Sequence, residues 1–514
     1  MNQPQKDGFM TAGTSLGHPC RARRRCGNTL AAALFLAVLL IFAISPCTLW
    51  AQAPSPSSPT PGSSTAPAQP DSGAPTMETP LPSKVLGQVP PTAKYTASGE
   101  ITDILQDLFD FHSPYSGTNS LRARNEAELS HSYTLYLGAR LTPRLEVYVN
   151  PEIALGNGVG SGSGLAGYPN GDLIGQPTLR PDPYLARLFV RWRIPLQSRA
   201  APKQKQNVKP GNDVIGGSLP ASRLVILAGK LAISDHFDVN TYANNARLQF
   251  LNNAFVNNLA YDKAADPRGY NHGLVVSIIR PALALRLGSI AMPTTAGGSH
   301  LAYSLAGRHS EQLELELHPR LLAGHGAQPL IVRVLAYRNQ GTMGRYQEAL
   351  QAAQGAMPPD VTTVRRRGAF KYGFGLNFEQ KVGDRGATGL FGRLGWNDGR
   401  TESFSYAEAD RFASLGGQVS GAHWGRAKDV LGAALAQSDL SGPHKAYLAA
   451  GGLGLSLGDG TLRYGSERIA EVYYAYQLSG NASLSPDYQF VSSPGCNRDR
   501  GPVSLLTLRL HLTF

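Results

Sequence analysis

Cysteine is nearly absent from this sequence, and only one long apolar run occurs. Four of the 514 residues are cysteines, and only Cys496 lies beyond residue 53, so the rest of the chain can form no intramolecular disulfide. Residues 30–44 form the single long apolar, uncharged stretch. Elsewhere nothing approaches the roughly 20 consecutive apolar residues of a membrane-spanning helix. If the rest of the chain crosses a membrane, it must do so as a β-barrel, because lipid leaves no other way to satisfy the backbone.

Charged residues are also few, at 16%, against 42% hydrophobic residues. The 57 glycines and 36 prolines predict many turns and few long helices. The formal net charge is +12, of which residues 1–53 carry +4, leaving about +8 for the remainder. A basic balance can indicate nucleic-acid or anionic partners. Here the arginines are spread along strand-like segments, so we expect no nucleic-acid binding.

The N-terminus has the pattern of an export signal. Residues 21–25 hold four arginines, residues 30–44 are apolar, and residues 51–53 read Ala-Gln-Ala. A basic region, an apolar region and a small-x-small site predict a signal peptide over residues 1–53 and Sec-type export to the periplasm. Residues 29–50 are nearly long enough to span a membrane, so an uncleaved anchor stays open, as does the cleavage point.

Residues 54–92 are rich in proline, serine, threonine and alanine and almost lack aromatic side chains. Such a composition buries too little apolar surface to fold, which predicts a disordered linker. Residues 93–514 are then the folded part of the chain.

The dominant pattern in that part has a period of two. Leu313, Leu315 and Leu317 alternate with Glu314 and Glu316. The same alternation recurs at residues 133–141, 188–194 and 472–478. Side chains of a strand point alternately to opposite faces, so each segment has one apolar and one polar face. A soluble half-buried sheet also fits this pattern. Runs of eight to ten residues that end in aromatic side chains favour a membrane barrel.

The last strand gives the sharpest signal. Five apolar side chains occupy alternate positions at the C-terminus: Leu506, Leu508, Leu510, Leu512 and Phe514. Arg509 lies between them, and arginine on a lipid face costs about 2–4 kcal/mol near the bilayer midplane. We therefore expect Arg509 to face the lumen and the leucines to face lipid. A terminal amphipathic strand ending in Phe514 resembles the signal by which the barrel-assembly machinery recognises its clients.

The length of this region predicts the size of the barrel. At one strand and one loop for roughly every 25 residues, residues 95–514 predict about 16 strands, a size that leaves an aqueous channel. The fold class predicted is therefore all-β, a transmembrane antiparallel β-barrel of about 16 strands.

Short segments along residues 95–514 recur in a characteristic order. They read FHSPYSG at 111–117, YVNPE at 148–152, LAGYPNG at 165–171, AGK at 228–230, NDG at 397–399, YG at 464–465 and NRDRGPVS at 497–504. In this order they resemble the OprB-type carbohydrate-selective porin family. The resemblance implies a 16-stranded barrel that passes small sugars passively across the outer membrane without catalysis or cofactor. Loops at residues 198–220 and 351–364 depart from it, so the substrate preference need not carry over.

Pore-lining candidates combine the polar strand faces with these family-like segments. A basic wall is expected from Arg140, Arg187, Arg191 and Arg193. Further candidates near turns or strand ends are Glu152, Lys230, Asp238 and Asn240. A dense charge cluster near the C-terminus comprises Glu467, Arg468, Glu471, Arg498, Asp499 and Arg500. Arginines and carboxylates on opposite walls can replace water around a sugar and steer ions. The alternative is that these charges pair only to hold the loops and the wall.

Other functions receive less support from the sequence. His300, His309, His318 and His325 are too widely spaced to read as a metal-ligand set. Ser161 lies in a glycine run that reads as a loop rather than a nucleophile elbow. A general diffusion porin, a barrel-embedded hydrolase and a secreted glycan-binding β-protein remain as alternatives. The sequence also leaves open whether barrels form a homo-oligomer.

Overall fold

The computed structural model describes residues 93–173, 178–179, 182–196, 205–302, 308–319, 330–355, 357–405 and 408–514. The predicted signal peptide and linker lie outside these residues. Within the described part of the chain, no helix is long and apolar enough to cross a membrane.

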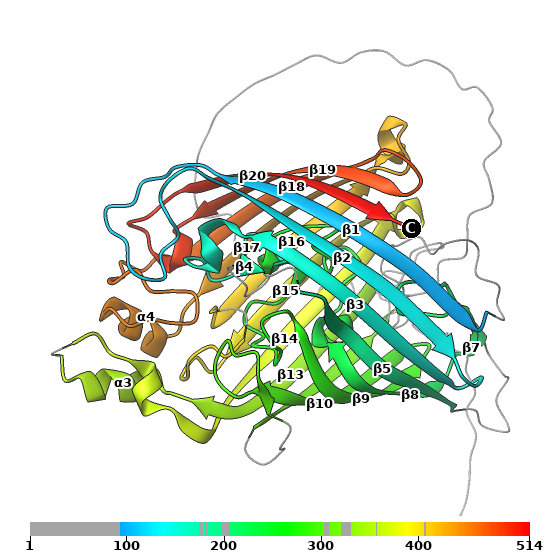
Figure 1. Cartoon of the computed structure of the whole chain (residues 1–514), viewed down its shortest axis with the longest axis horizontal. Helices are drawn as coiled ribbons and strands as arrows, with labels where there is room; N and C mark the ends of the chain where they lie inside the picture. Colours follow the sequence, from blue (N-terminus) through cyan, green and yellow to red (C-terminus); the bar gives the residue numbers. More distant parts are fainter. Residues whose placement is uncertain are drawn as a thin grey trace, which may run out of the picture. The chain divides into compact units, whose positions relative to one another are not determined.

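Sixteen long antiparallel strands form a closed wall (Figure 1). The main sheet contains 18 strands, of which β4 and β11 are two-residue segments. Strand β1 pairs with both β2 and β20, so the sheet closes on itself. The predicted all-β barrel of about 16 strands is therefore confirmed. The wall strands are β1 (Tyr95–Leu108), β2 (Glu126–Arg140), β3 (Leu145–Asn157), β5 (Tyr184–Pro195), β8 (Arg223–Ala232), β9 (Tyr270–Arg280), β10 (Leu283–Pro293), β12 (His309–Leu317), β13 (Leu330–Met343), β14 (Arg366–Gly383), β15 (Thr388–Asn397), β16 (Arg411–Ser420), β17 (Val430–Asp439), β18 (Glu467–Gln477), β19 (Ala482–Ser492) and β20 (Val503–Thr513).

The remaining elements are short and belong to the connections. The extra strands are β4 (Thr178–Leu179), β6 (Lys205–Val208), β7 (Gly217–Pro220) and β11 (Leu301–Ala302). The α-helices within the described residues are α2 (Asn253–Val256), α3 (Tyr346–Ala353) and α4 (Gly442–Ala449). The 3₁₀ turns are η1 (Val159–Gly162), η2 (Ile233–Asp235), η3 (Val361–Val364), η4 (Asp384–Gly386), η5 (Gly421–Trp424) and η6 (Pro494–Cys496). Ser161 lies in η1, within the predicted loop.

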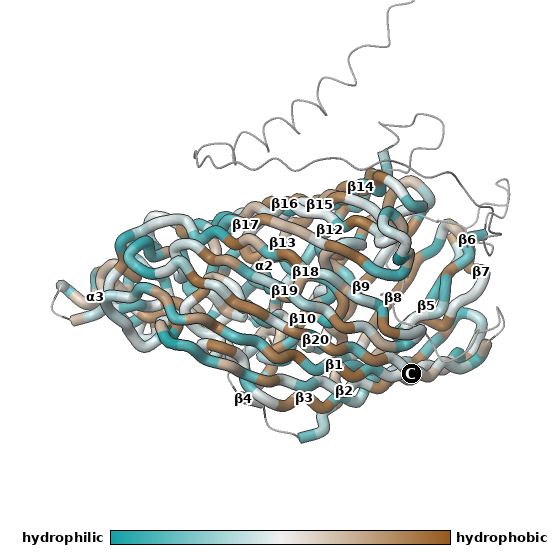
Figure 2. Tube along the Cα trace, turned by 90° about the horizontal axis from the view of Figure 1, so that it is seen from above, coloured by the Kyte–Doolittle hydropathy of each residue, from teal (hydrophilic) through white to brown (hydrophobic). Residues whose placement is uncertain are grey.

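The two faces of the wall differ as the period-two pattern predicts. On β20, Leu506 and Leu508 are 49% and 44% exposed, whereas Arg509 is 1% exposed. Leu313 is likewise exposed, while its neighbour Glu314 is fully buried. Apolar and polar residues alternate along the strands in Figure 2. The outward side chains form the apolar band that lipid requires, and the charged side chains turn into the lumen.

Loop length orients the barrel. At one end, residues 141–144, 281–282 and 478–481 form tight turns. At the other end, long connections include residues 233–269 and 440–466. Outer-membrane barrels have short periplasmic turns and longer extracellular loops, so the chain enters β1 and leaves β20 at the periplasmic end. Helices α3 and α4 lie at the extracellular end, and β7 lies at the opposite end (Figure 1).

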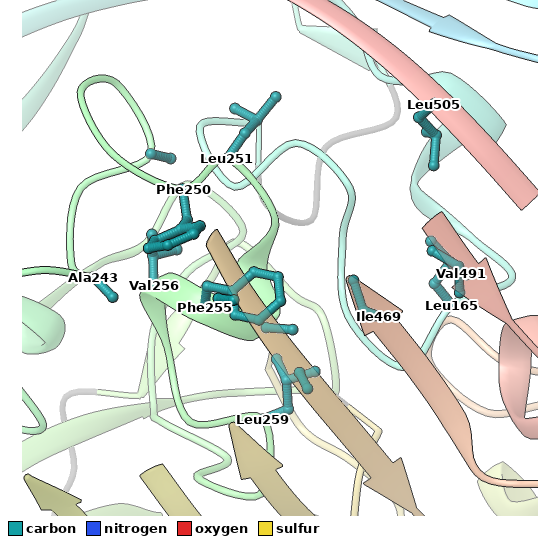
Figure 3. Close-up of a cluster of buried hydrophobic side chains, with 14 of the residues drawn as sticks. Leu165, Ala243, Phe250, Leu251, Phe255, Val256, Leu259, Ile469, Val491 and Leu505 are labelled. Atoms are coloured by element: carbon teal, nitrogen blue, oxygen red, sulfur yellow. The ribbon is translucent and has the colours of Figure 1, made fainter. Parts of the chain in front are cut away.

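One extracellular loop, residues 233–269, folds back into the lumen; we call it the inner loop. Its Phe250 and Phe255 rings lie 5.3 Å apart. Phe250 also packs against Phe391 of β15 at 5.5 Å and Tyr473 of β18 at 4.9 Å. Figure 3 shows Phe250 and Phe255 within this buried cluster. Apolar contact with two separate wall strands holds the inner loop across the channel and narrows it.

Candidate functional site

Polar contacts complete the attachment of the inner loop. The Glu471 carboxylate on β18 accepts hydrogen bonds from the backbone N–H groups of Leu251 and Asn252, at 2.5 and 2.9 Å. Three strands away in the wall, Arg393 Nε of β15 donates to Asp238 Oδ2 at 2.8 Å. Because wall charges satisfy backbone groups that would otherwise be buried unpaired, the loop is fixed at both ends of its span.

Arg247, in the middle of the inner loop, is the centre of the charge network. Its guanidinium reaches Glu100 on β1 at 2.6 Å, Glu152 on β3 at 3.1 Å and Asp172 of another extracellular loop at 2.6 Å. The Arg247 side chain is only 12% exposed, and the Glu100 and Glu152 side chains are each 4% exposed. Three carboxylates around one cation leave this site with a formal excess of negative charge.

A cavity of about 150 Å³ lies beside Arg247. Tyr184 and Tyr270 stand on its wall with ring centroids 6.1 Å apart. Both hydroxyls donate to Glu152, that of Tyr270 at 3.0 Å. The Arg268 guanidinium covers the Tyr184 ring at 3.7 Å. The cavity therefore offers aromatic surface together with charged hydrogen-bonding groups.

Several polar groups of the cavity are half-buried rather than sealed. Asp235 of η2 is 25% exposed and accepts from Arg187 Nε at 2.8 Å. Asn244, Asn245 and Asn257 of the inner loop are also partly exposed. A carboxylate accepts hydrogen bonds and an amide both accepts and donates, so this lining can exchange hydrogen bonds with the hydroxyls of a sugar as water does.

Each of the four arginines predicted to form a basic wall pairs with a carboxylate. Arg140, Arg191 and Arg193 converge on the single carboxylate of Glu146, at 3.0, 3.8 and 2.6 Å. Arg187 lies higher on β5 and pairs with Asp235. The ion pairs bring Arg140, Arg191 and Arg193 together around Glu146, where they leave a positive excess.

A second set of charges crosses the opposite wall. Arg286 on β10 reaches Glu314 and Glu316 on β12 at 2.8 and 3.0 Å. Arg333 on β13 reaches Glu316 at 2.8 Å and Glu379 on β14 at 3.6 Å. All of these side chains are at most 2% exposed. Removing one partner of such a buried pair costs about 3–5 kcal/mol, because an unpaired charge is left in the wall.

Four further residues were predicted to line the pore, and they lie at different positions in the barrel. Glu152 lies inside β3, not at a turn, and is part of the Arg247 network. Asp238 and Asn240 anchor the inner loop to Asn377 of β14, both at 2.8 to 2.9 Å. The Lys230 ammonium lies 3.9 Å from Asp266 and above the Tyr270 ring. These residues line or brace the narrowed zone.

The C-terminal charges do not form one cluster. Glu467 is buried and accepts from the N–H groups of Ala166 and Gly495. Arg468 is exposed on the outer face beside Gln437, because it follows the inward-facing Glu467 by one strand position. The prediction that Arg468 lines the pore is therefore wrong.

Residues 498–500 belong to the last extracellular loop. Arg500 donates to the carbonyls of Tyr115 and Leu121. Asp499 accepts from the Tyr115 hydroxyl, and Arg498 donates to the carbonyl of Tyr464 at 2.7 Å. The three side chains hold neighbouring loops together, in agreement with the structural alternative for this segment.

Among the groups outside the wall strands, Lys263 and Asp213 have shifted pKa values. Burial lowers the pKa of Lys263, on the inner loop, to about 8. Burial also raises the pKa of Asp213, in the connection between β5 and β8, although the nearby Arg187 opposes the shift.

Sequence reasoning missed the centre of the site. Arg247, Asp172 and Asp235 all lie in loops, where no periodicity assigns a side chain to a face. The only local signal is the concentration of asparagine in residues 240–258, a composition typical of irregular backbone that hydrogen-bonds to itself.

A closed 16-stranded barrel with a charged lumen, narrowed by an inward loop, defines a porin-like outer-membrane channel. The family model described as "Carbohydrate-selective porin, OprB family" matches residues 118–514. The chain belongs to the OprB family of carbohydrate-selective porins, and it is an outer-membrane sugar porin.

One solved structure supports the fold. The high-pH structure of Pseudomonas putida OprB is similar with a TM-score of 0.61 and 15% identity, over 82% of this chain and 94% of that one. The low-pH structure of the same protein gives 0.42 and 13%, over 82% and 93%. Salmonella typhi OmpF in complex with daunomycin gives 0.43 and 9%, over 82% and 98%. Comparison with curated proteins gives no match.

Proposed function

We propose that sugars cross this porin by passive diffusion and pause in the cavity beside Arg247. The observation that carries the proposal is the composition of that cavity, which combines half-buried Asp235 with Arg187, Arg247 and the Tyr184 and Tyr270 rings. Carboxylates and guanidinium groups replace the water shell of a sugar, and the rings cover its apolar faces. Transport then needs no energy source and no covalent step.

The charges also favour uncharged solutes. The Arg247 site has a negative excess, and the Glu146 site below it has a positive excess. An ion of either sign meets one unfavourable site on its way, whereas a neutral sugar meets none. A general diffusion porin without sugar selectivity is the alternative, and it predicts no preference for sugars over other neutral solutes.

Planar-bilayer recording tests this proposal. We expect stepwise ohmic conductance that glucose reduces more than glycerol does at equal viscosity. Asp235→Asn should weaken the glucose effect because it removes a charged acceptor from the cavity, and charged hydrogen bonds contribute about 1.5–3 kcal/mol. Asp384→Asn is the matched control, since Asp384 is exposed in the η4 turn. Equal effects of glucose and glycerol would favour general diffusion, and silent bilayers with folded protein would contradict both.

We also propose how the protein reaches its membrane. Residues 1–53 act as the signal for Sec-type export, and residues 54–92 serve as a periplasmic linker. The barrel-assembly machinery recognises the terminal strand, where Phe514 exchanges backbone hydrogen bonds with Gly99 of β1 at 2.8 and 3.0 Å. Deleting Phe514 should lower the amount of folded protein in outer-membrane fractions. Cross-linking in native membranes tests for a homo-oligomer.

A further inference from the structure

Among the described residues of the periplasmic connections, those between β5 and β8 are distinguished by the paired strands β6 and β7. We call residues 205–220 the periplasmic hairpin. Its tip closes through two hydrogen bonds between Gly211 and Val214, at 3.0 and 3.2 Å. Strands β6 and β7 form their own sheet, separate from the wall.

The tip of the periplasmic hairpin lies inside the barrel. The Asn150 amide, on the lumen face of β3, donates to both Asp213 carboxylate oxygens at 2.8 and 3.0 Å. Asn150 is five residues above the periplasmic start of β3 at Leu145. At about 3.3 Å per residue and a tilt of about 40°, the tip therefore reaches roughly 10–15 Å into the channel.

Wall residues of three strands hold the tip there. Arg140 Nη2, on β2, donates to the Ile215 carbonyl at 2.8 Å. The Tyr148 hydroxyl, on β3, accepts from the Ile215 N–H at 3.1 Å. Arg191 Nη1, on β5, donates to the Asp213 carbonyl at 2.7 Å. These three hydrogen bonds satisfy backbone groups of Asp213 and Ile215. We therefore read the tip as a fixed insertion in the lumen.

The periplasmic hairpin also covers an apolar part of the lumen wall. Val225 and Leu227 point into the lumen from β8, where polar side chains are expected. They belong to one buried cluster with Phe189 and with Ile215 of the periplasmic hairpin, and Ile215 is fully buried. Without the hairpin, this apolar patch would face water in the channel, so wall and hairpin are complementary surfaces.

The tip of the periplasmic hairpin lies next to the sugar cavity, on its periplasmic side. Arg187 Nε lies 2.8 Å from Asp235, which lines the cavity, and 3.6 Å from Asp213 of the hairpin. A solute that leaves the cavity toward the periplasm therefore meets Asp213 among the arginines of the basic wall. The Asp213 carboxylate offsets part of their positive charge and lowers the local concentration of anions.

We infer that the periplasmic hairpin is a second constriction, in series with the inner loop, and that Asp213 makes it discriminate against anionic sugar derivatives in favour of uncharged sugars. This inference rests on the proposed route through the lumen. Sugar acids and sugar phosphates would otherwise be attracted to Arg140, Arg187 and Arg191, and anchored there.

Two variants test the hairpin in planar bilayers and proteoliposomes. Asp213→Asn keeps the shape and removes the charge. It should raise the ratio of gluconate to glucose permeation about threefold, the factor for one unit charge about 6 Å from a solute in water-like surroundings. Replacing residues 209–216 by Asn-Gly, a two-residue turn that suits the Val208–Gly217 pair, should about double the conductance if the two constrictions have similar resistance. Asp384→Asn, in the periplasmic turn between β14 and β15, should change neither quantity.

The outcomes separate this inference from the proposed function. If the unaltered protein conducts and both folded variants keep its conductance and its gluconate-to-glucose ratio, the inference is overturned and the sugar route stands. If the variant with the shortened hairpin conducts and the unaltered protein does not, the periplasmic hairpin closes the channel, which supports a constriction at this position. If no variant conducts, the sugar route and the inference both fail. Heat-modifiable migration on gels verifies folding, and Asp213→Asn keeps the test valid if the shortened variant does not fold.

Discussion

Arg247→Gln is the most informative single substitution in this protein. The change removes the one positive charge that pairs with Glu100, Glu152 and Asp172, at 2.6 to 3.1 Å. Breaking a buried ion pair by removing one partner costs about 3–5 kcal/mol, because the carboxylates stay behind without their cation. Most of this cost should fall on the inner loop, which Arg247 ties to β1 and β3.

The Arg247→Gln substitution should also change the ion selectivity of the channel. At a dielectric constant of about 80, a unit charge about 6 Å from a passing ion contributes about 0.7 kcal/mol, or about threefold in permeability. Arg247→Gln should therefore raise the cation-to-anion permeability ratio about threefold and weaken the glucose effect on conductance. Adding Glu152→Gln should restore part of the original ratio, since the two residues share one network and their effects are not additive.

The assay is the reversal potential in a salt gradient, combined with protease digestion of the inner loop. Arg338→Gln is the matched control, because Arg338 is 52% exposed and its carboxylate partner Glu311 is 51% exposed, at 3.8 Å. Such surface pairs contribute little to stability. An unchanged reversal potential and unchanged protease resistance in Arg247→Gln would refute the assigned role of Arg247.

Three further predictions concern the wall and the loop. Replacing Arg187 and Arg191 together with alanine should lower the anion-to-cation permeability ratio, and an unchanged ratio would mean that these side chains do not act on the permeating ions. Since burial lowers the pKa of Lys263 to about 8, raising the pH from 7 to 9 should remove its charge and reduce the anion preference of the channel. Lys263→Met should flatten the pH profile of ion selectivity in this range. An identical profile in the variant would contradict a role of Lys263 in ion selectivity. Leu508→Arg should destabilise the barrel by about 2–4 kcal/mol in urea titration, against about 0–1 kcal/mol for Leu512→Arg near the end of β20; equal costs would show that Leu508 does not face the lipid interior.

The wall of this protein could be predicted from the sequence because lipid enforces a simple rule. Arginine is costly in lipid and leucine is not, so alternation around Arg509 and Leu508 assigns both faces of β20 without knowledge of any neighbour. The same rule placed Arg187 and Arg191 on the lumen face of β5.

The interior of the channel could not be predicted in the same way. Arg247 and Asp213 lie in connections, where the direction of a side chain depends on contacts with strands far away in the sequence. Clustering of charges in the sequence does not place Arg468 in the lumen, because a shift of one strand position reverses the face and Glu467 already points inward. On β8 the inward-facing Val225 and Leu227 are apolar, and the structure shows that Ile215 of the periplasmic hairpin packs in the same buried cluster.

The flux of radiolabelled glucose into proteoliposomes tests most directly whether this lumen is a sugar channel. The folded protein should carry glucose at a rate proportional to its concentration gradient, without an energy source and faster than gluconate. Liposomes that contain folded barrels but take up glucose no faster than protein-free liposomes would contradict the account.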